Sequence, residues 1–287
     1  MDIAVLGLGR MGHALAQRLL DEGHHVVVWN RSPGRAGDLV GAGAREAQSI
    51  ADAAGAAEVA VTILADDDAV QHVALGDSGV RAALPDGALY VDASTVAPTT
   101  SDALLEAFGS DRFASMPVLG APSAVEAGKA TYLVGAAPHV VDRLQPMTKS
   151  LSEKVLALPS PHVAASAKLA SNLVLLSGVV ALAEAFAIAR AGGMSDDQLR
   201  TLLAENPVVS PAVRLRFEGI LTGEQDTWWS TALGAKDARL AAELAAAEGV
   251  DAPLAFATRD RYRAAAERDP DADIAAITRL YSASRAG

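Results

Sequence analysis

The sequence predicts an α/β fold in two parts: a doubly wound parallel-sheet domain over residues 1–160 and an all-α domain over residues 161–287. Two observations lead to this prediction. As far as the Pro-Ser-Pro at 159–161, short apolar runs alternate with helical stretches, which is typical of a parallel sheet covered on both faces. Beyond that point no convincing strand follows, and long Ala- and Leu-rich stretches are typical of helices.

The individual elements follow from the periodicity of the apolar residues. The expected strands are residues 3–6, 26–29, 59–64, 89–91, 112–118, 130–134 and 154–158. The helices expected between them include residues 14–20, 47–54, 66–73 and 98–108. The second domain is expected to begin with one long interdomain helix over 163–190, followed by helices from the cap at Ser195 to 205, over 231–248 and over 254–267.

The first turn carries the motif Gly7-Leu8-Gly9-Arg10-Met11-Gly12, placed between a strand and a helix. In a Rossmann βαβ unit, glycines at this spacing bind the pyrophosphate of a dinucleotide. Gly7 allows the tight turn, Gly9 lets the backbone approach the phosphates, and Gly12 lets the helix pack on the strand. The N–H groups at the helix start complete the predicted phosphate site.

The end of the second strand indicates which dinucleotide is bound. An NAD site would place an acidic residue there, but this chain has Asn30, Arg31 and Ser32. A guanidinium and a hydroxyl suit a 2′-phosphate, which a carboxylate would repel. The sequence therefore favours NADP(H), with Arg35 as a second candidate. The alternative is that Arg31 is only a solvated turn residue.

Composition limits the possible partners. The net charge of −11 argues against nucleic acid, and the absence of cysteine excludes disulfides and thiolate metal sites. The most apolar stretch, 173–183, is shorter than the ~20 residues that span a bilayer, so we expect a core helix and no membrane partner.

The run 66–68 of three aspartates fits a solvated helix start better than a metal site. No leader sequence is visible, which predicts a cytoplasmic protein.

Two polar residues on the long helix are candidates for chemistry. Lys168 and Asn172 are four residues apart, so they share one helix face, which we expect to border the interdomain cleft. A lysine in a partly apolar cleft is a potential general acid or base. The alternative is a surface lysine beside a capping asparagine. Ligands of such folds bind at the carboxyl ends of strands, where Leu64-Ala65 and Ser94-Thr95 lie.

Six short motifs are spread over nearly the whole chain: Gly7 to Gly12, Asn30-Arg31-Ser32, Ser94-Thr95 with Pro98, Met116-Pro117-Val118, Lys168 with Asn172, and Lys236-Asp237. In these motifs the chain resembles the β-hydroxyacid dehydrogenases, the family of 3-hydroxyisobutyrate dehydrogenase. The resemblance implies that Lys168 is the catalytic lysine and Asn172 its partner. It also implies that Thr95 and Lys236 contact the nicotinamide half of the cofactor.

The chain departs from that family on the substrate side. Leu119-Gly120-Ala121 replaces the usual Ser-Gly-Gly that helps to bind the substrate carboxylate, and His162 and Ala164 replace a Gly-x-Gly. The expected function is NADP(H)-dependent hydride transfer to or from a small β-hydroxy acid or its aldehyde or keto partner. One alternative is an imine reductase, which shares the plan but usually lacks the lysine. Another is a module that binds NADPH without turnover.

Three further expectations concern less specific features. His162 is either a helix-start residue or a group that shares in proton transfer. Trp228 and Trp229 either line the pocket or pack in the core. Because the long helix needs more cover than this domain provides, we expect a homodimer or a tetramer of dimers, with residues 163–190 near the interface.

Overall fold

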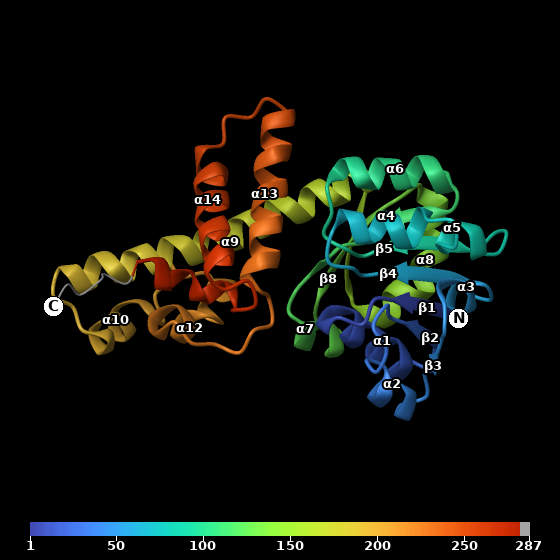
Figure 1. The fold of residues 1–287 in the computed structure, drawn as a ribbon, viewed down its shortest axis with the longest axis horizontal. Helices are drawn as coiled ribbons and strands as arrows, with labels where there is room; N and C mark the ends of the chain where they lie inside the picture. Colours follow the sequence, from blue (N-terminus) through green and yellow to red (C-terminus); the bar gives the residue numbers. More distant parts are fainter. Residues whose placement is uncertain (282–287) are drawn as a thin grey trace. The chain divides into compact units, whose positions relative to one another are not determined.

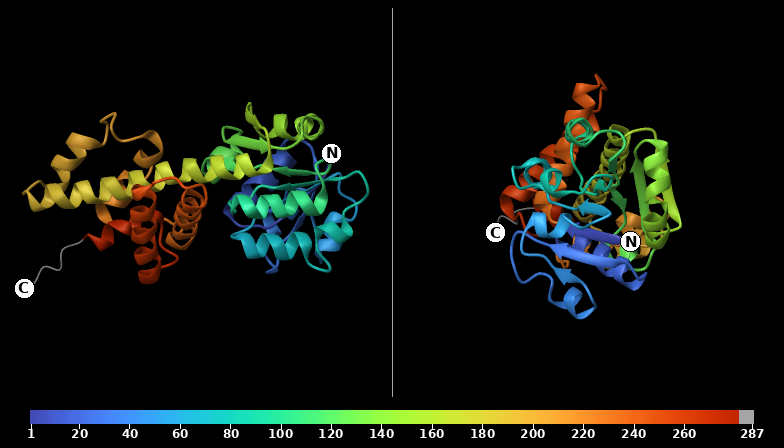
Figure 2. Two further views of the ribbon diagram at one scale, coloured as in Figure 1. Left: turned by 90° about the horizontal axis from the view of Figure 1, so that it is seen from above. Right: turned by 90° about the vertical axis from the view of Figure 1, so that its right-hand side faces the viewer.

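The computed structural model describes residues 1–281 and divides the chain into two compact units, residues 1–168 and those from 169 onward (Figure 1). The border lies within helix α9, Pro161–Ala191, beyond the predicted domain end at residue 160. Figure 2 shows α9 as one unbroken helix, as its apolar pattern predicted. The two units are described separately below.

The first unit is built on one sheet, whose strands lie in the order β3-β2-β1-β4-β5-β6-β8-β7, with β9 beside β8. Neighbours from β3 to β6 are parallel, β8 runs antiparallel to β6 and β7, and β9 is parallel to β8. The strand bounds are β1 Asp2–Leu6, β2 His25–Trp29, β3 Arg45–Glu46, β4 Val59–Thr62, β5 Leu89–Asp92, β6 Phe113–Ser115, β7 Val118–Leu119, β8 Thr131–Gly135 and β9 Lys154–Leu158.

Helices cover both faces of this sheet, as the doubly wound prediction requires (Figures 1 and 2). Along β1, Ile3 and Val5 face the core shared with α1 and α8, whereas Ala4 and Leu6 face the core shared with α4 and α6. Alternate side chains of a strand point to opposite faces, so β1 is buried on both sides. The helices are α1 Arg10–Asp21, α2 Gly37–Gly41, α3 Ile50–Ala54, α4 Asp67–Leu75, α5 Val80–Ala83, α6 Pro98–Phe108, α7 Pro122–Glu126 and α8 Pro138–Leu151.

The single strand predicted over 112–118 was wrong: it is two strands, β6 and β7. Pro117 lies between them and has no N–H to donate to a neighbouring strand, while its carbonyl accepts from Leu133 N at 3.0 Å. The chain therefore leaves β5 after Ser115 and pairs again with β8 from Val118. This break places Val118 and Leu119 at the start of the small-residue loop.

The second unit is helical over its described residues, apart from one isolated bridge between Ser230 and Asp273. Its elements after α9 are α10 Asp196–Leu203, α11 Pro211–Arg214, α12 Phe217–Thr222, α13 Thr231–Ala247, α14 Pro253–Arg268 and the 3-10 helix η1 Ile274–Leu280. Leu176, Val179 and Phe186 of α9 are buried in its core. By length and composition α9 is apolar enough to cross a bilayer, and 44% of its most apolar window is buried inside the structure. The core explains these buried side chains, whereas other apolar side chains of α9, such as Val174, are exposed.

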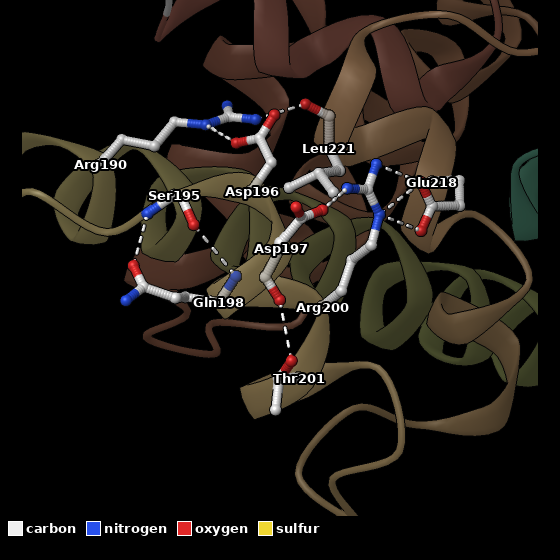
Figure 3. A network of polar contacts seen from close by, with 9 residues as sticks. All are labelled: Arg190, Ser195, Asp196, Asp197, Gln198, Arg200, Thr201, Glu218 and Leu221. Carbon is white, nitrogen blue, oxygen red and sulfur yellow. Dashed lines mark hydrogen bonds and ion pairs between the residues drawn. The ribbon is translucent and has the colours of Figure 1, made fainter.

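The predicted cap at Ser195 is present at the start of α10 (Figure 3). Ser195 Oγ accepts from Gln198 N at 3.3 Å, and Gln198 Oε1 accepts from Ser195 N at 2.8 Å. This reciprocal capping box satisfies N–H groups that the helix itself leaves without partners. The Arg190 side chain also donates to Asp196 at 2.8 Å, which joins the end of α9 to the start of α10.

Candidate active site

The turn between β1 and α1 has a geometry that requires glycine at Gly7 and Gly12. Gly7 has a φ of +108°, and a Cβ there would lie 2.4 Å from Ile63 O. A Cβ on Gly12 would lie 1.9 Å from Gly7 O, so α1 packs directly on the turn. A Cβ on Gly9 would meet nothing within 4 Å, so the backbone there is open to an approaching ligand. Gly9 precedes α1 without a side-chain cap, which leaves the first turn suited to a phosphate.

Asn30 connects this turn to the end of β2. Its Oδ1 accepts from Leu8 N at 2.9 Å, and its Nδ2 donates to Ser32 O at 2.9 Å. An aspartate could accept the first bond but could not donate the second. From the sequence, Asn30 was interpreted only as the residue that stands where an NAD site would have an acidic one. The structure adds that it orders the segment carrying Arg31. Arg31 and Ser32 are exposed.

The ends of β4 and β5 lie side by side, at the edge where β1 and β2 also end. Ser94 Oγ accepts from Leu64 N at 2.9 Å and so joins the two predicted cofactor segments. Leu64 and Thr95 are half-buried, and Ala65 is exposed. The structure thus brings the residues predicted at the two strand ends together within the first unit.

Lys168 lies beside the loop that was predicted to hold the substrate. Its Nζ donates to Val118 O at 2.7 Å, one residue before Leu119. Gly120 has a φ of +149°, and a Cβ there would come within 3.3 Å of the Ala124 and Ala130 methyl groups. This position of the loop therefore favours glycine over any residue with a side chain. The first unit alone brings the predicted catalytic lysine next to the predicted substrate segment.

Asn172 and Lys236 meet on one buried carboxylate in the second unit. Asn172 Nδ2 donates to Asp237 Oδ2 at 2.7 Å, and Lys236 Nζ lies 3.0 Å from Asp237 Oδ1. A carboxylate only accepts, so the amide nitrogen of Asn172 must face Asp237 and its oxygen must point away. Asp237 was part of a recognised motif, but its role as the shared partner was missed because that contact spans distant residues.

The tryptophan pair lies next to a buried cation. The Arg216 guanidinium is 3.4 Å from the centroid of the Trp228 ring, and the backbone N–H groups of Trp228 and Trp229 each donate to Asp273 Oδ2 at 3.3 Å. Arg216 and Asp273 are themselves an ion pair at 3.0 Å. Burial lowers the pKa of Arg216, and the facing carboxylate opposes that shift. This pair orders the segment that leads into α13.

His162 and the aspartate run both make polar contacts near the starts of their helices. His162 Nδ1 lies 2.8 Å from Asp102 Oδ2, which tethers the start of α9 to α6. Asp66 caps α4 by accepting from Ala69 N at 2.8 Å. Asp67 accepts from Thr100 Oγ1 at 2.6 Å and so joins α4 to α6. A role for His162 in proton transfer stays a prediction.

Comparison with known proteins identifies the family. Residues 2–158 match the family described as the NAD binding domain of 6-phosphogluconate dehydrogenase. Residues 163–281 match the one described as "NAD-binding of NADP-dependent 3-hydroxyisobutyrate dehydrogenase". The chain belongs to the β-hydroxyacid dehydrogenase family. As a member of this family, it is an oxidoreductase with an NAD(P)-binding Rossmann domain.

Three relatives illustrate the range of this β-hydroxyacid dehydrogenase family. An uncharacterized oxidoreductase, YfjR of Bacillus subtilis, is 31% identical over 96% of this chain and 98% of its own. The Mycobacterium tuberculosis 3-hydroxyisobutyrate dehydrogenase, solved with L-serine, is 26% identical with a TM-score of 0.83, covering 98% of this chain and 99% of its own. Psf3, solved with NADP+ and 2-OPP, is 25% identical with a TM-score of 0.89, covering 98% and 100%.

The imine reductases share the fold. The Streptomyces aurantiacus imine reductase is 22% identical with a TM-score of 0.62, covering 98% of this chain and 99% of its own. At this identity the likeness concerns the fold alone. The choice between a carbonyl and an imine substrate therefore depends on the residues of the site.

Proposed function

We propose that this protein is an NADP(H)-dependent oxidoreductase that moves hydride between the nicotinamide and a small β-hydroxy acid or its aldehyde or keto partner. The observation that carries the proposal is the position of Lys168, whose Nζ is bonded to Val118 O directly before the loop Leu119-Gly120-Ala121. A lysine held beside a substrate loop is suited to proton transfer at the reacting oxygen.

The lysine would act in both directions of the reaction. When bound, the nicotinamide supplies or accepts the hydride. In oxidation, neutral Lys168 takes the hydroxyl proton as the carbonyl forms; in reduction, its ammonium polarises the carbonyl and then donates a proton. The Val118 carbonyl orients Nζ, because an ammonium has three N–H donors and can donate to that carbonyl and to a substrate oxygen. Asn172, oriented by Asp237, would present its amide oxygen to a substrate donor.

The imine reductase alternative rests on the departures at Leu119 and His162. A leucine offers no hydroxyl to a substrate carboxylate, so the loop is less polar than the family pattern. The test is an assay of reduced-nicotinamide absorbance, with NADP+ and 3-hydroxy acids in one arm and NADPH with aldehydes, ketoacids or cyclic imines in the other. Activity on hydroxy acids or carbonyls is the expected result. Activity confined to imines would overturn the proposal in favour of the alternative.

The preference for NADP(H) is testable at Arg31. Arg31→Ala is expected to weaken NADPH binding about 10- to 100-fold, because a charge-assisted bond to the 2′-phosphate is lost. NADH affinity should change by less than about twofold. The measurement is titration calorimetry with both cofactors, and Arg81→Ala, at an exposed arginine on α5, is the control. Equal losses for NADPH and NADH would contradict the assignment.

We further propose a homodimer, or a tetramer built from dimers, that uses α9. Exposed apolar residues recur along this helix at spacings of 7, 4, 7 and 7, namely Val163, Ala170, Val174, Ala181 and Ile188. Val174 is 74% exposed and Ile188 is 73% exposed. Such spacing forms one apolar stripe, which an identical helix can cover. Light scattering should give at least twice the 29.4 kDa chain mass, and a monomeric mass would remove the proposal.

A further inference from the structure

The ends of β4 and β5 enclose a polar cluster that the proposed reaction does not use. Thr62, Tyr90 and Asp92 are each 0% exposed, and Ser94 is 3% exposed. A carboxylate sealed in this way is costly unless several donors compensate it. The donors present here come from both strand ends.

The chemistry of the groups fixes the direction of each hydrogen bond. Asp92 Oδ1 accepts from Thr62 Oγ1 at 2.8 Å, from Ser94 Oγ at 2.7 Å and from Ser94 N at 3.3 Å. Thr62 has one hydroxyl proton, so its contact with Tyr90 OH at 2.7 Å requires Tyr90 to donate. Burial and the charge of Asp92 both raise the pKa of Tyr90, which keeps its hydroxyl proton available.

Ser94 connects Asp92 to the chain segment at Leu64. Because its hydroxyl proton is directed at Asp92, its oxygen can accept from Leu64 N, and that bond is 2.9 Å long. Leu64 lies two residues beyond the end of β4, and Thr95, which follows Ser94, lies three residues beyond the end of β5. One buried carboxylate therefore holds the segment at Thr95, which is proposed to contact the nicotinamide half of the cofactor, and the segment at Leu64, which is proposed to bind the cofactor beside it.

We infer that Asp92 is a positioning residue for the nicotinamide half of the cofactor, acting through Ser94 on the segments at Leu64 and Thr95. This inference rests on the proposed function, because it assumes that those segments contact the cofactor. A positioning role differs from a purely structural role because it affects the binding of one half of the cofactor and not the other. Loss of the cluster should weaken contacts with the nicotinamide half and leave the adenine half, bound near Gly9 and Arg31, unaffected.

Two ligands separate the halves. NADPH reports on the whole cofactor, whereas adenosine 2′,5′-bisphosphate carries the adenine and the 2′-phosphate without the nicotinamide. Ser94→Ala should weaken NADPH binding about tenfold, the worth of one lost hydrogen bond, and change the bisphosphate affinity by less than about twofold. Asp92→Asn keeps one acceptor oxygen and should give a smaller loss in NADPH affinity. Calorimetry on the full chain supplies both dissociation constants.

The matched control is Ser152→Ala. Ser152 is also a buried serine, 4% exposed, whose Oγ donates to Ala130 O at 2.6 Å and accepts from Lys154 N at 3.1 Å. It precedes β9, at the end of that strand opposite its carboxyl end. Its loss should lower the melting temperature as Ser94→Ala does and leave both affinities within about twofold of wild type.

The outcomes are distinct. Equal losses for both ligands in Ser94→Ala, or an NADPH affinity that does not change, would overturn the inference. Wild-type protein that prefers NADH would contradict the proposed cofactor, and the same comparison with NADH and ADP would then test Asp92. Wild-type protein that binds neither cofactor would overturn both.

Discussion

Lys168→Met is expected to lower kcat about 10²- to 10⁴-fold while the affinity for NADPH changes little. Methionine has a similar length but cannot accept or donate the proton at the substrate oxygen, and it cannot donate to Val118 O. The cofactor contacts proposed at the glycine turn and at Arg31 lie on other elements of the first unit. Initial rates with the best substrate and calorimetry with NADPH measure the two effects separately.

Lys149→Met is the control for this prediction, because Lys149 is an exposed lysine in the last turn of α8. It should leave kcat unchanged. Turnover that survives in Lys168→Met would show that another group handles the proton, and His162, paired with Asp102, would be the next residue to test. A wild-type chain that binds NADPH but turns over none of the substrate classes would instead favour the binding-module alternative.

The fold could be predicted in outline because periodicity is a local signal. Strands such as β9 and helices such as α13 were placed within a few residues, since alternating or 3.6-residue patterns are visible in short windows. The prediction missed α8, which continues through Pro146 although a proline inside a stretch argues against a helix there. It also missed the antiparallel turn at β7 and β8, because pairing partners cannot be determined from one strand alone.

In the candidate site, too, local motifs could be predicted from the sequence and long-range contacts could not. The glycine turn, Arg31 and Lys168 could be proposed from the sequence because each belongs to a short motif. The contacts that hold the polar residues could not be proposed in this way: Val118 O lies 50 residues from Lys168, and Asp237 lies 65 residues from Asn172. Such contacts depend on how distant segments pack together, so the spacing of residues within a motif cannot predict them. The cofactor preference, the cytoplasmic location and the dimer stay predictions.

Asp273→Ala should lower the free energy of unfolding of the second unit by about 3–5 kcal/mol, because it leaves a buried cation without its partner. The Arg216 and Asp273 side chains are 0% and 1% exposed, and Arg216 Nε donates to Asp273 Oδ1 at 3.0 Å. Asp273 also accepts from Ala275 N at 3.0 Å, at the start of η1. Urea unfolding followed by tryptophan fluorescence is suitable, since Trp228 lies on the Arg216 guanidinium.

Two comparison variants separate the buried charge from a general loss of contacts. The Asp197 side chain is 94% exposed and pairs with Arg200. Asp197→Ala should therefore change the free energy of unfolding by less than about 1 kcal/mol. The double variant Arg216→Met with Asp273→Leu removes both charges and should recover much of the stability lost in Asp273→Ala. If the double variant is no more stable than the single one, the hydrogen bonds of Asp273 to the Trp228 and Ala275 backbones, rather than the ion pair, hold this part of the second unit together.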